Sequence, residues 1–411
     1  MNAASLKLTL RVLARRKVFT AISLFGVSFT LATLMVVTSV FDHAFGDHAP
    51  DPDSSTTLGV YTMRLSGEHF ISSGNPGYGF LDKQVRTLST PERVVIISQP
   101  ASGSIYEGGR KFDIQVRNVE PAFWDLTRFR FLEGAPFTAD DDSAARQVAV
   151  INETTRRRLY GAASAVSREL EFEGRTFRVV GVVRDVSAIQ QTTAGDVWFP
   201  MGASLSTGDR AELRGGYLGL VKLKSPRDKA AAQAEFATRI KAMQLPGDYK
   251  ELQSGLDTPF EAVSREMLSD NMGSSHPALL LALAFGVAVL FMLLPAVNLA
   301  NLAISRALER SAEIGVRKAF GATGRQLIQQ LLFENLVLTV LGGVISIPIA
   351  ALTLALVNRS GLVDYADFGI NGRVLAWGLA AAVVFSVISG IYPAWRLSRL
   401  EPAEAMRGRA S

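Results

Sequence analysis

The side chains that most often perform catalysis are scarce in this sequence, and their spacing does not suit an active site. The 411 residues include four histidines and no cysteine, which excludes disulfides, thiolate catalysis and cysteine-ligated metals. The histidines, at positions 43, 48, 69 and 276, lack the His-x3-His spacing of a helical metal site. No Gly-x-Ser-x-Gly nucleophile elbow occurs. We therefore predict that the chain is not an enzyme and binds no metal itself.

Two other groups of residues could bind a ligand but have a more ordinary interpretation. The acidic run Asp140–Asp142 could hold calcium, although charge patterning favours a solvated loop. The aromatic pair Phe123 and Trp124, and also Trp198, could bind an apolar ligand if they were exposed. Packing in a hydrophobic core is the commoner fate of such side chains. We assign neither group as a site.

The apolar residues gather in long runs near the start and in the last third of the chain. A membrane-spanning helix needs about 20 apolar residues. Four segments satisfy this requirement, at residues 18–41, 277–304, 336–357 and 374–395, and none has a charged side chain in its central stretch. The first ends at Phe41-Asp42-His43, which is not a small-residue cleavage site, so we predict an anchor and not a signal peptide. The spans show no buried ionisable residue of the kind that ion pathways need.

The flanking charges predict an orientation. The net charge is +5, and Lys and Arg lie at the ends of the apolar runs, which is typical of membrane topology and not of a nucleic-acid groove. Basic clusters precede the first span, separate the second from the third, and follow the fourth. The positive-inside rule therefore places both termini in the cytoplasm. It makes residues 42–276 an external domain, 358–373 a short external loop and 396–411 a cytoplasmic tail.

Residues 1–17 form an amphipathic helical pattern. Leu6, Leu10 and Leu13 share one face, and basic side chains share another. Such a helix could lie in the inner interface of the membrane, with its cations near anionic lipid headgroups. It could equally be a basic flank that only sets the topology.

The external region alternates strand-like and helix-like patterns between Gly, Pro and Ser punctuation. We predict strands at 58–64, 93–98, 112–119, 147–151, 169–173, 176–183 and 218–224, and helices at 153–160, 226–242 and 259–272. The expected fold class is thus an α-helical membrane protein with four transmembrane helices and a large α+β domain inserted between the first and second.

A charged elbow at residues 305–335, which includes the entry to the third span, is the most informative stretch. On a helix, Arg306, Arg310, Glu313 and Arg317 share one face at spacings of four, three and four. Small residues share the opposite face, where they permit close helix approach. The elbow could dock a cytoplasmic protein, or it could be an idle basic loop.

The elbow also carries a family resemblance. Its segment 313–322, EIGVRKAFGA, resembles the signature of the FtsX/MacB-like permeases of the type VII ABC transporter superfamily. Residues 392–396 (YPAWR) and 400–407 (LEPAEAMR) resemble the family's C-terminal ending, and 147–152 with 175–183 resemble its periplasmic core domain. Glu334 falls at the family's position near the start of the third span.

The resemblance implies a function that the residues alone do not establish. It implies a permease subunit in the bacterial inner membrane that works as a dimer, with itself or a paralogue. ATP and Mg would be bound by a separate cytoplasmic ATPase, since no Gly-x4-Gly-Lys-[Ser/Thr] loop occurs here. The resemblance implies that Glu313, Arg317, Ala319, Gly321 and Ala322 contact that ATPase, and that its motion reaches the external domain, by mechanotransmission, for export or release of a substrate.

Other partners that the resemblance allows are a periplasmic adaptor and membrane lipid, but no nucleic acid. An alternative function from a different class is a membrane-anchored receptor or regulator whose external domain binds a periplasmic partner without energy coupling. The substrate cannot be deduced from the residues.

Overall fold

The computed structural model of the chain describes residues 17–107, 110–269, 272–309, 323–370 and 372–398, which fall into two compact units. The helical unit contains the described residues up to Asp42, those of 282–360 and those from Phe368 onward. The sheet unit contains His43–Leu281 and Gly361–Asp367. The predicted amphipathic segment 1–17 lies almost wholly outside the described residues, as do most of the tail 396–411 and the elbow residues 310–322.

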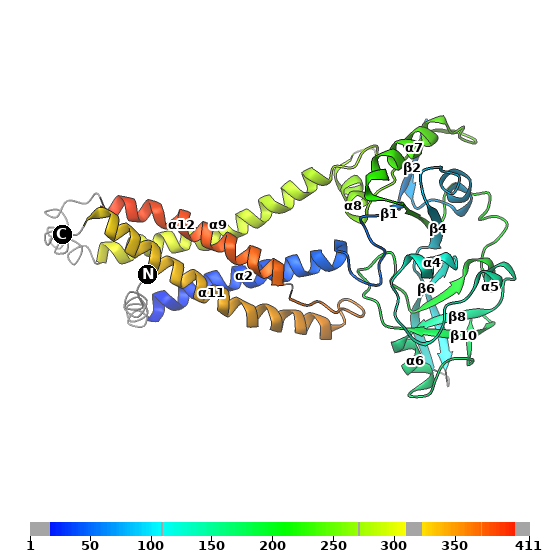
Figure 1. Ribbon diagram of the computed structural model, residues 1–411, viewed down its shortest axis with the longest axis horizontal. Helices are drawn as coiled ribbons and strands as arrows, with labels where there is room; N and C mark the ends of the chain where they lie inside the picture. The colour runs from blue at the N-terminus through cyan, green and yellow to red at the C-terminus, as the bar shows by residue number, and fades with distance from the viewer. Residues whose placement is uncertain (1–16, 108–109, 270–271, 310–322, 371, 399–411) are drawn as a thin grey trace. The chain divides into compact units, whose positions relative to one another are not determined.

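The described residues of the helical unit include four long helices, each of which contains one of the predicted spans. They are α2 (Lys17–Phe45), α9 (Pro277–Glu309), α11 (Gly324–Ser360) and α12 (Gly372–Ser398). Figure 1 shows them side by side. Val27 and Leu31 of α2, Met292 of α9 and Ala382 of α12 form one buried apolar cluster between them. Other apolar side chains on these helices, such as Phe25 and Phe285, are exposed, as expected of a lipid-facing surface.

Two of these helices are long and apolar enough to cross a membrane over their described residues. They are the stretches Thr20–Phe45 and Ile328–Ser360, while shorter apolar stretches, Pro277–Leu293 and Leu375–Ile388, lie in α9 and α12. The count of four spans therefore stays a prediction. The stretch in α11 also contains Glu334, which is only 3% exposed and lies two residues before the predicted span 336–357. The prediction that this span has no charged side chain in its central stretch is unaffected.

Two adjacent glycines of α11 allow neighbouring helices to approach closely. A Cβ atom on Gly342 would lie 2.6 Å from Cγ1 of Val27 in α2. A Cβ atom on Gly343 would lie 2.6 Å from Cδ1 of Leu379 in α12. Small residues permit this kind of contact between membrane helices. These two glycines are thus used for packing within one chain.

The described residues of the sheet unit form thirteen strands and several shorter helices. The strands are β1 (Thr57–Val60), β2 (Met63–Gly67), β3 (Ile71–Gly74), β4 (Arg93–Ser98), β5 (Ala101–Glu107), β6 (Arg110–Val119), β7 (Phe131–Gly134), β8 (Val148–Asn152), β9 (Glu169–Phe172), β10 (Arg175–Val183), β11 (Val197–Pro200), β12 (Tyr217–Lys222) and β13 (Tyr249–Ser254). The helices are α3 (Tyr78–Phe80), η1 (Leu81–Val85), α4 (Ala122–Leu126), α5 (Ala139–Ser143), α6 (Glu153–Tyr160), η2 (Met201–Ala203), η3 (Pro226–Asp228), α7 (Lys229–Ala242) and α8 (Pro259–Leu268). The predicted α+β class is confirmed.

Six of the strands close into a ring. The pairing runs β6–β11–β8–β10–β9–β5, and β5 pairs again with β6. The pairs β6–β11 and β8–β10 are parallel, whereas the other four are antiparallel. Apolar side chains that alternate along these strands, such as Ile114, Phe177 and Phe199, fill the inside of the ring. A closed ring leaves no free sheet edge there.

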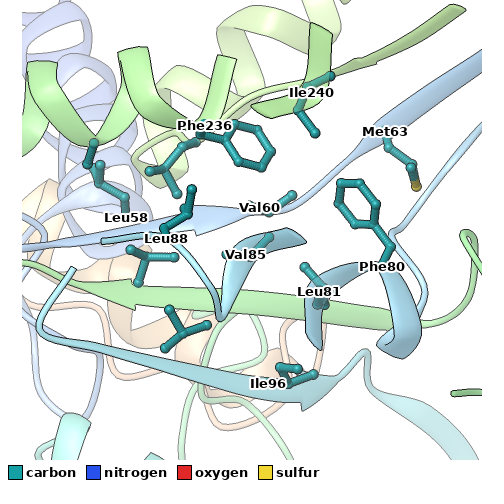
Figure 2. Packing of buried hydrophobic residues seen from close by; sticks show 14 of the residues in the cluster. Leu58, Val60, Met63, Phe80, Leu81, Val85, Leu88, Ile96, Phe236 and Ile240 are labelled. Carbon is teal, nitrogen blue, oxygen red and sulfur yellow. The ribbon is translucent and has the colours of Figure 1, made fainter. Parts of the chain in front are cut away.

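The same sheet continues past the ring through β4, β12 and β1, and a separate small sheet has the order β13–β2–β3. Helix α7 packs against the part of the sheet unit that contains these strands. Figure 2 shows Phe236 and Ile240 of α7 pointing towards Val60 and Val85, and all four are buried. The predicted strand 58–64 is in fact two strands, because the chain leaves the first sheet after Val60 and enters the small sheet at Met63.

The aromatic residues Phe123, Trp124 and Trp198 pack in a core, as predicted. The three residues are 0%, 8% and 0% exposed, respectively. Trp124 meets Phe123 and Trp198 edge to face, with ring centroids 5.3 and 6.1 Å apart. Such contacts add to the hydrophobic gain from burial.

The acidic run forms the short helix α5 and not a loop. Thr138 caps it, with Asp141 completing a reciprocal capping box, and Asp141 also pairs with Arg146 at 2.9 Å. Oδ1 of Asp142 accepts a hydrogen bond of 2.7 Å from the backbone N–H of Gly202. These carboxylates therefore serve helix capping and packing.

Candidate functional site

The residues predicted to contact an ATPase, Glu313, Arg317, Ala319, Gly321 and Ala322, lie outside the described residues. The structure describes the helices on either side of this stretch. Helix α9 ends at Glu309, and α11 begins at Gly324. Thr323 and Gln326 cap the start of α11 reciprocally, with N···O distances of 3.0 and 3.3 Å.

A second candidate region is the loop between α11 and α12, of which residues 361–367 belong to the sheet unit. We call these residues the tether loop. The carbonyl oxygen of Asp364 accepts a hydrogen bond of 2.9 Å from the N–H of Ala188. The hydroxyl of Tyr365 donates to Oδ1 of Asp196 at 2.5 Å. The sequence predicted only a short external loop, 358–373, here.

Asp196 is a buried carboxylate that joins three strands of the ring. Asp196 directly precedes β11 and is only 5% exposed. Oδ2 accepts from the backbone N–H of Gln115 in β6 at 2.7 Å, and Oδ1 accepts from Nδ2 of Asn152 at the end of β8 at 2.8 Å. The backbone of Asp196 also bonds to Gln115 and Asn152, at 2.7 and 2.9 Å. Charge-assisted bonds of this kind are stronger than neutral ones.

Asn152 and Tyr365 complete this network. Asn152 is fully buried and also caps α6, since its Oδ1 accepts from the N–H of Thr155 at 2.7 Å. Burial and the neighbouring carboxylate of Asp196 raise the pKa of Tyr365 above its ordinary value. The phenol is therefore held neutral, which is the form that donates to Asp196.

A cleft of about 510 Å³ lies beside the tether loop, in the sheet unit. Tyr365, Ala366 and Asp367 form part of its wall. Three arginines also line it, at positions 128, 130 and 184, together with the carboxylates of Glu153, Asp185 and Asp367. The lining therefore carries both signs of charge.

A second cleft, of about 380 Å³, lies near a buried cation. It is lined by Asp51, Tyr61 and Thr192 among others. Behind these residues, the fully buried guanidinium of Arg117 donates to the carbonyl oxygens of Ala194 at 2.6 Å, Ser98 at 3.1 Å and Gln191. Burial lowers the pKa of Arg117 to about 9, although the charge of Asp51 opposes this shift.

Asp51 is the acidic counterpart of Arg117. Its Oδ1 accepts from the hydroxyl of Thr193. Burial raises the pKa of Asp51 to about 6, against the effect of this bond and of Arg117. The interaction of Arg117 with Asp51 is electrostatic, while the guanidinium donates its hydrogen bonds to the carbonyl oxygens of Ala194, Ser98 and Gln191.

Within the described part of the chain, no group of three or more His, Cys, Asp or Glu side chains is arranged to hold a metal ion. His43 and His48 stack with ring centroids 5.6 Å apart.

Two segments of the chain match models of two domains that occur in one permease family. A model of the MacB-like periplasmic core domain matches residues 20–239, and a model of the FtsX-like permease C-terminal matches residues 285–402. The chain belongs to the MacB/FtsX-like permeases. It is thus an ABC transporter permease of this type, a class of inner-membrane protein, and the predicted family resemblance is confirmed.

Individual relatives of this permease are distant. YknZ, an uncharacterized ABC transporter permease of Bacillus subtilis, is 24% identical over 362 residues, which are 85% of this chain and 85% of that protein. The macrolide export ATP-binding/permease protein MacB of Shewanella oneidensis is 23% identical over 98% of this chain, which spans 60% of that relative. Among solved structures, the periplasmic region of MacB from Actinobacillus actinomycetemcomitans is 18% identical, covers 48% of this chain and 86% of its own length, and has a TM-score of 0.35.

Sequence reasoning missed the network around Asp196. Asn152 stands between a predicted strand and a predicted helix, which is a signal for helix capping. Asp196 directly precedes β11, a strand that the sequence did not predict. Tyr365 is one of two aromatic residues in the predicted loop 358–373. Nothing in the spacing connects residues that are 169 positions apart.

Proposed function

We propose that this permease is the membrane subunit of an ABC transporter complex and transmits ATP-driven conformational change to its sheet unit. The observation that carries the proposal is the family membership, which extends over both the periplasmic core domain and the permease C-terminal part. ATP and Mg are bound by a separate cytoplasmic ATPase. The sheet unit, predicted to be periplasmic, then moves or releases a substrate on the outer side.

The proposed entry point for the motion is the elbow, at Glu313, Arg317, Ala319, Gly321 and Ala322. Its charged residues suit a polar protein surface, and its small residues suit close approach of a partner helix. Four spans, cytoplasmic termini and pairing with a second permease, either itself or a paralogue, complete the proposed assembly. A periplasmic adaptor is a further proposed partner.

The decisive experiment reverses charge in the elbow. The double variant Glu313→Lys with Arg317→Glu keeps the net charge but inverts its pattern. We expect the co-purifying ATPase to be lost, or its ATP turnover in the complex to fall at least about tenfold, as for loss of a buried interfacial ion pair. Lys224→Glu with Glu171→Lys, two residues of the sheet unit, is the matched control. Unchanged co-purification and turnover in the elbow variant would exclude this role.

A second candidate is a membrane-anchored receptor or regulator of a periplasmic partner without energy coupling. The two clefts of the sheet unit, about 510 and 380 Å³, favour it, because both are in the size range of ligand sites. Affinity purification in mild detergent separates the two functions. An ATPase among the partners supports the first, and a periplasmic protein without any ATPase supports the second.

A further inference from the structure

We propose that Tyr365 and Asp196 form a latch through which the α11–α12 hairpin moves the six-stranded ring of the sheet unit. The inference rests on the proposed function and adds to it a second route for motion, besides the continuous chain at α2 and α9. Tyr365 is a positioning residue in this proposal, since it acts by holding the tether loop against Asp196.

The sheet side of the latch is rigid. Asp196 is bonded to Gln115 of β6 and Asn152 of β8, both of which belong to the ring. These bonds lie inside a closed set of strands, so a pull on Asp196 is shared by several strands and not by one loop. A bond from the Tyr365 hydroxyl to this carboxylate therefore reaches the framework of the ring directly.

The helix side of the latch is short. In the helical unit, Nδ2 of Asn358 donates to the carbonyl oxygen of Phe368 at 3.0 Å, and the N–H of Phe368 donates back to Oδ1 of Asn358 at 3.1 Å. The hydroxyl of Ser39 in α2 donates to the next carbonyl, of Gly369, at 2.7 Å. The reciprocal pair and the Ser39 bond close the base of the loop, so that α2 and α11 hold the chain at Phe368 and Gly369.

The tip of the loop can move only a little relative to its base. Tyr365 is three residues from Phe368, and three residues span at most about 10 Å even when fully extended. A larger displacement of the base must either pull on Asp196 or break the Tyr365 bond. The loop therefore behaves as a short tether with a releasable end.

The backbone of Tyr365 indicates that this end is held in place by its contacts. Its φ is +55°, in the left-handed region that a bulky residue other than glycine rarely adopts. Such a conformation persists where surrounding contacts over-determine it. Here the contacts are the hydroxyl bond to Asp196 and the adjacent bond from Ala188 to the carbonyl of Asp364.

The first test removes only the latch hydroxyl. Tyr365→Phe is compared with Tyr78→Phe, whose hydroxyl also donates to a carboxylate of the sheet unit, that of Glu120, at 3.4 Å. The complex with its co-purified ATPase is placed in lipid nanodiscs, with and without ATP trapped by vanadate. Hydrogen exchange is then measured in peptides that contain Ala188 and Gln115, whose N–H groups bond to Asp364 and Asp196.

We expect the Ala188 amide to exchange about tenfold faster in Tyr365→Phe, because a hydrogen bond to a charged group is lost. The change in exchange that ATP trapping causes in the ring should shrink at least about threefold, in keeping with that loss. ATP turnover should persist, and Tyr78→Phe should behave as the wild type. No ATP response in the wild type would overturn the proposed function and the latch together. A full-sized response in Tyr365→Phe would overturn the latch alone.

The second test replaces the latch by a covalent bond. The chain has no cysteine, so Ala188→Cys with Asp364→Cys introduces a single pair. One backbone hydrogen bond of 2.9 Å joins the two residues, and a disulfide needs Cα atoms about 4.4–6.8 Å apart. Once mass spectrometry shows the bond, oxidation should restore the ATP response to the Tyr365→Phe protein, and reduction should remove it again.

The same cysteine pair also tests the latch if Tyr365→Phe does not fold. In the otherwise wild-type chain, the oxidised pair should keep the full ATP response, because the proposed latch stays closed while it transmits motion. Loss of the response on oxidation would overturn the proposal. If Tyr365 had only a structural role, oxidation would not restore the ATP response of the Tyr365→Phe protein.

Discussion

Arg265 of α8 and Asp257 form a two-pronged ion pair in the interior of the sheet unit. Nε donates to Oδ2 at 2.6 Å, and Nη2 donates to Oδ1 at 2.9 Å. The exposed fractions of the two side chains are 9% and 4%. The backbone of Asp257 exchanges two hydrogen bonds with Gly59 of β1, at 2.7 and 2.9 Å. The pair therefore joins α8 to the edge of the main sheet.

Breaking this pair from one side should strongly destabilise the protein. Asp257→Asn leaves the guanidinium buried without its counter-charge, at a cost of about 3–5 kcal/mol in the free energy of unfolding. Urea unfolding of the full chain, followed by the fluorescence of the buried Trp124 and Trp198, measures it. The exposed pair of Lys250 and Glu68 is the control, because Glu68→Gln should cost less than about 1 kcal/mol. Equal effects of both substitutions would contradict this account.

Asp51 should make the protein less stable as the pH rises from about 4 to 6. Burial raises its pKa from 3.8 to about 6, so the folded protein holds a proton that the unfolded chain releases. The free energy of unfolding then falls through this window, by on the order of 2 kcal/mol for this one group. Asp51→Asn cannot titrate. From pH 4 to pH 7, the unfolding free energy of the wild type should therefore fall by that amount relative to that of the variant. A difference between the two proteins that does not change with pH would refute the prediction.

Gly342 should be intolerant of a side chain, unlike Gly286. A Cβ on Gly342 would lie 2.6 Å from Val27, whereas no described atom lies within 4 Å of a Cβ on Gly286. We expect Gly342→Ala to destabilise the helical unit by about 1–3 kcal/mol through overpacking. Gly286→Ala should be neutral or stabilise by up to about 1 kcal/mol through helix propensity. Unfolding in increasing dodecyl sulfate, followed by circular dichroism, compares them, and the reverse order would disprove the packing.

The predicted topology places the elbow and the sheet unit on opposite sides of the membrane. Because the chain has no cysteine, single cysteines report directly on exposure. A membrane-impermeant maleimide should label Thr207→Cys, in the sheet unit, in intact spheroplasts. It should label Ala312→Cys, in the elbow, only after the membrane is permeabilised, since the basic residues around it favour the cytoplasm. Labelling of both cysteines in intact spheroplasts would place the elbow and the sheet unit on the same side of the membrane. It would thereby remove the basis for coupling.

The sequence by itself determined the elements whose signals are local. Helix α6 runs from Glu153 to Tyr160 as predicted, because Asn152 caps its start and Gly161 ends it in a left-handed turn. Helix α8 begins at Pro259 as predicted, but it ends at Leu268 and not at residue 272. Strand β3, with only one apolar side chain in Ile71–Gly74, gave no periodic signal and was missed. Strand β11 was missed because VWFP is buried throughout and shows no alternation.

The candidate site was only partly accessible to the same reasoning. The family could be deduced from short motifs, because their residue types are specific. The latch could not, because Tyr365 and Asp196 meet only after the ring has closed and the α11–α12 loop has joined the sheet unit. Hydropathy and capping act over a few neighbouring residues, so the chain alone decides where its helices and spans lie. Which buried carboxylate receives a distant hydroxyl depends on long-range packing, which only the tertiary structure decided.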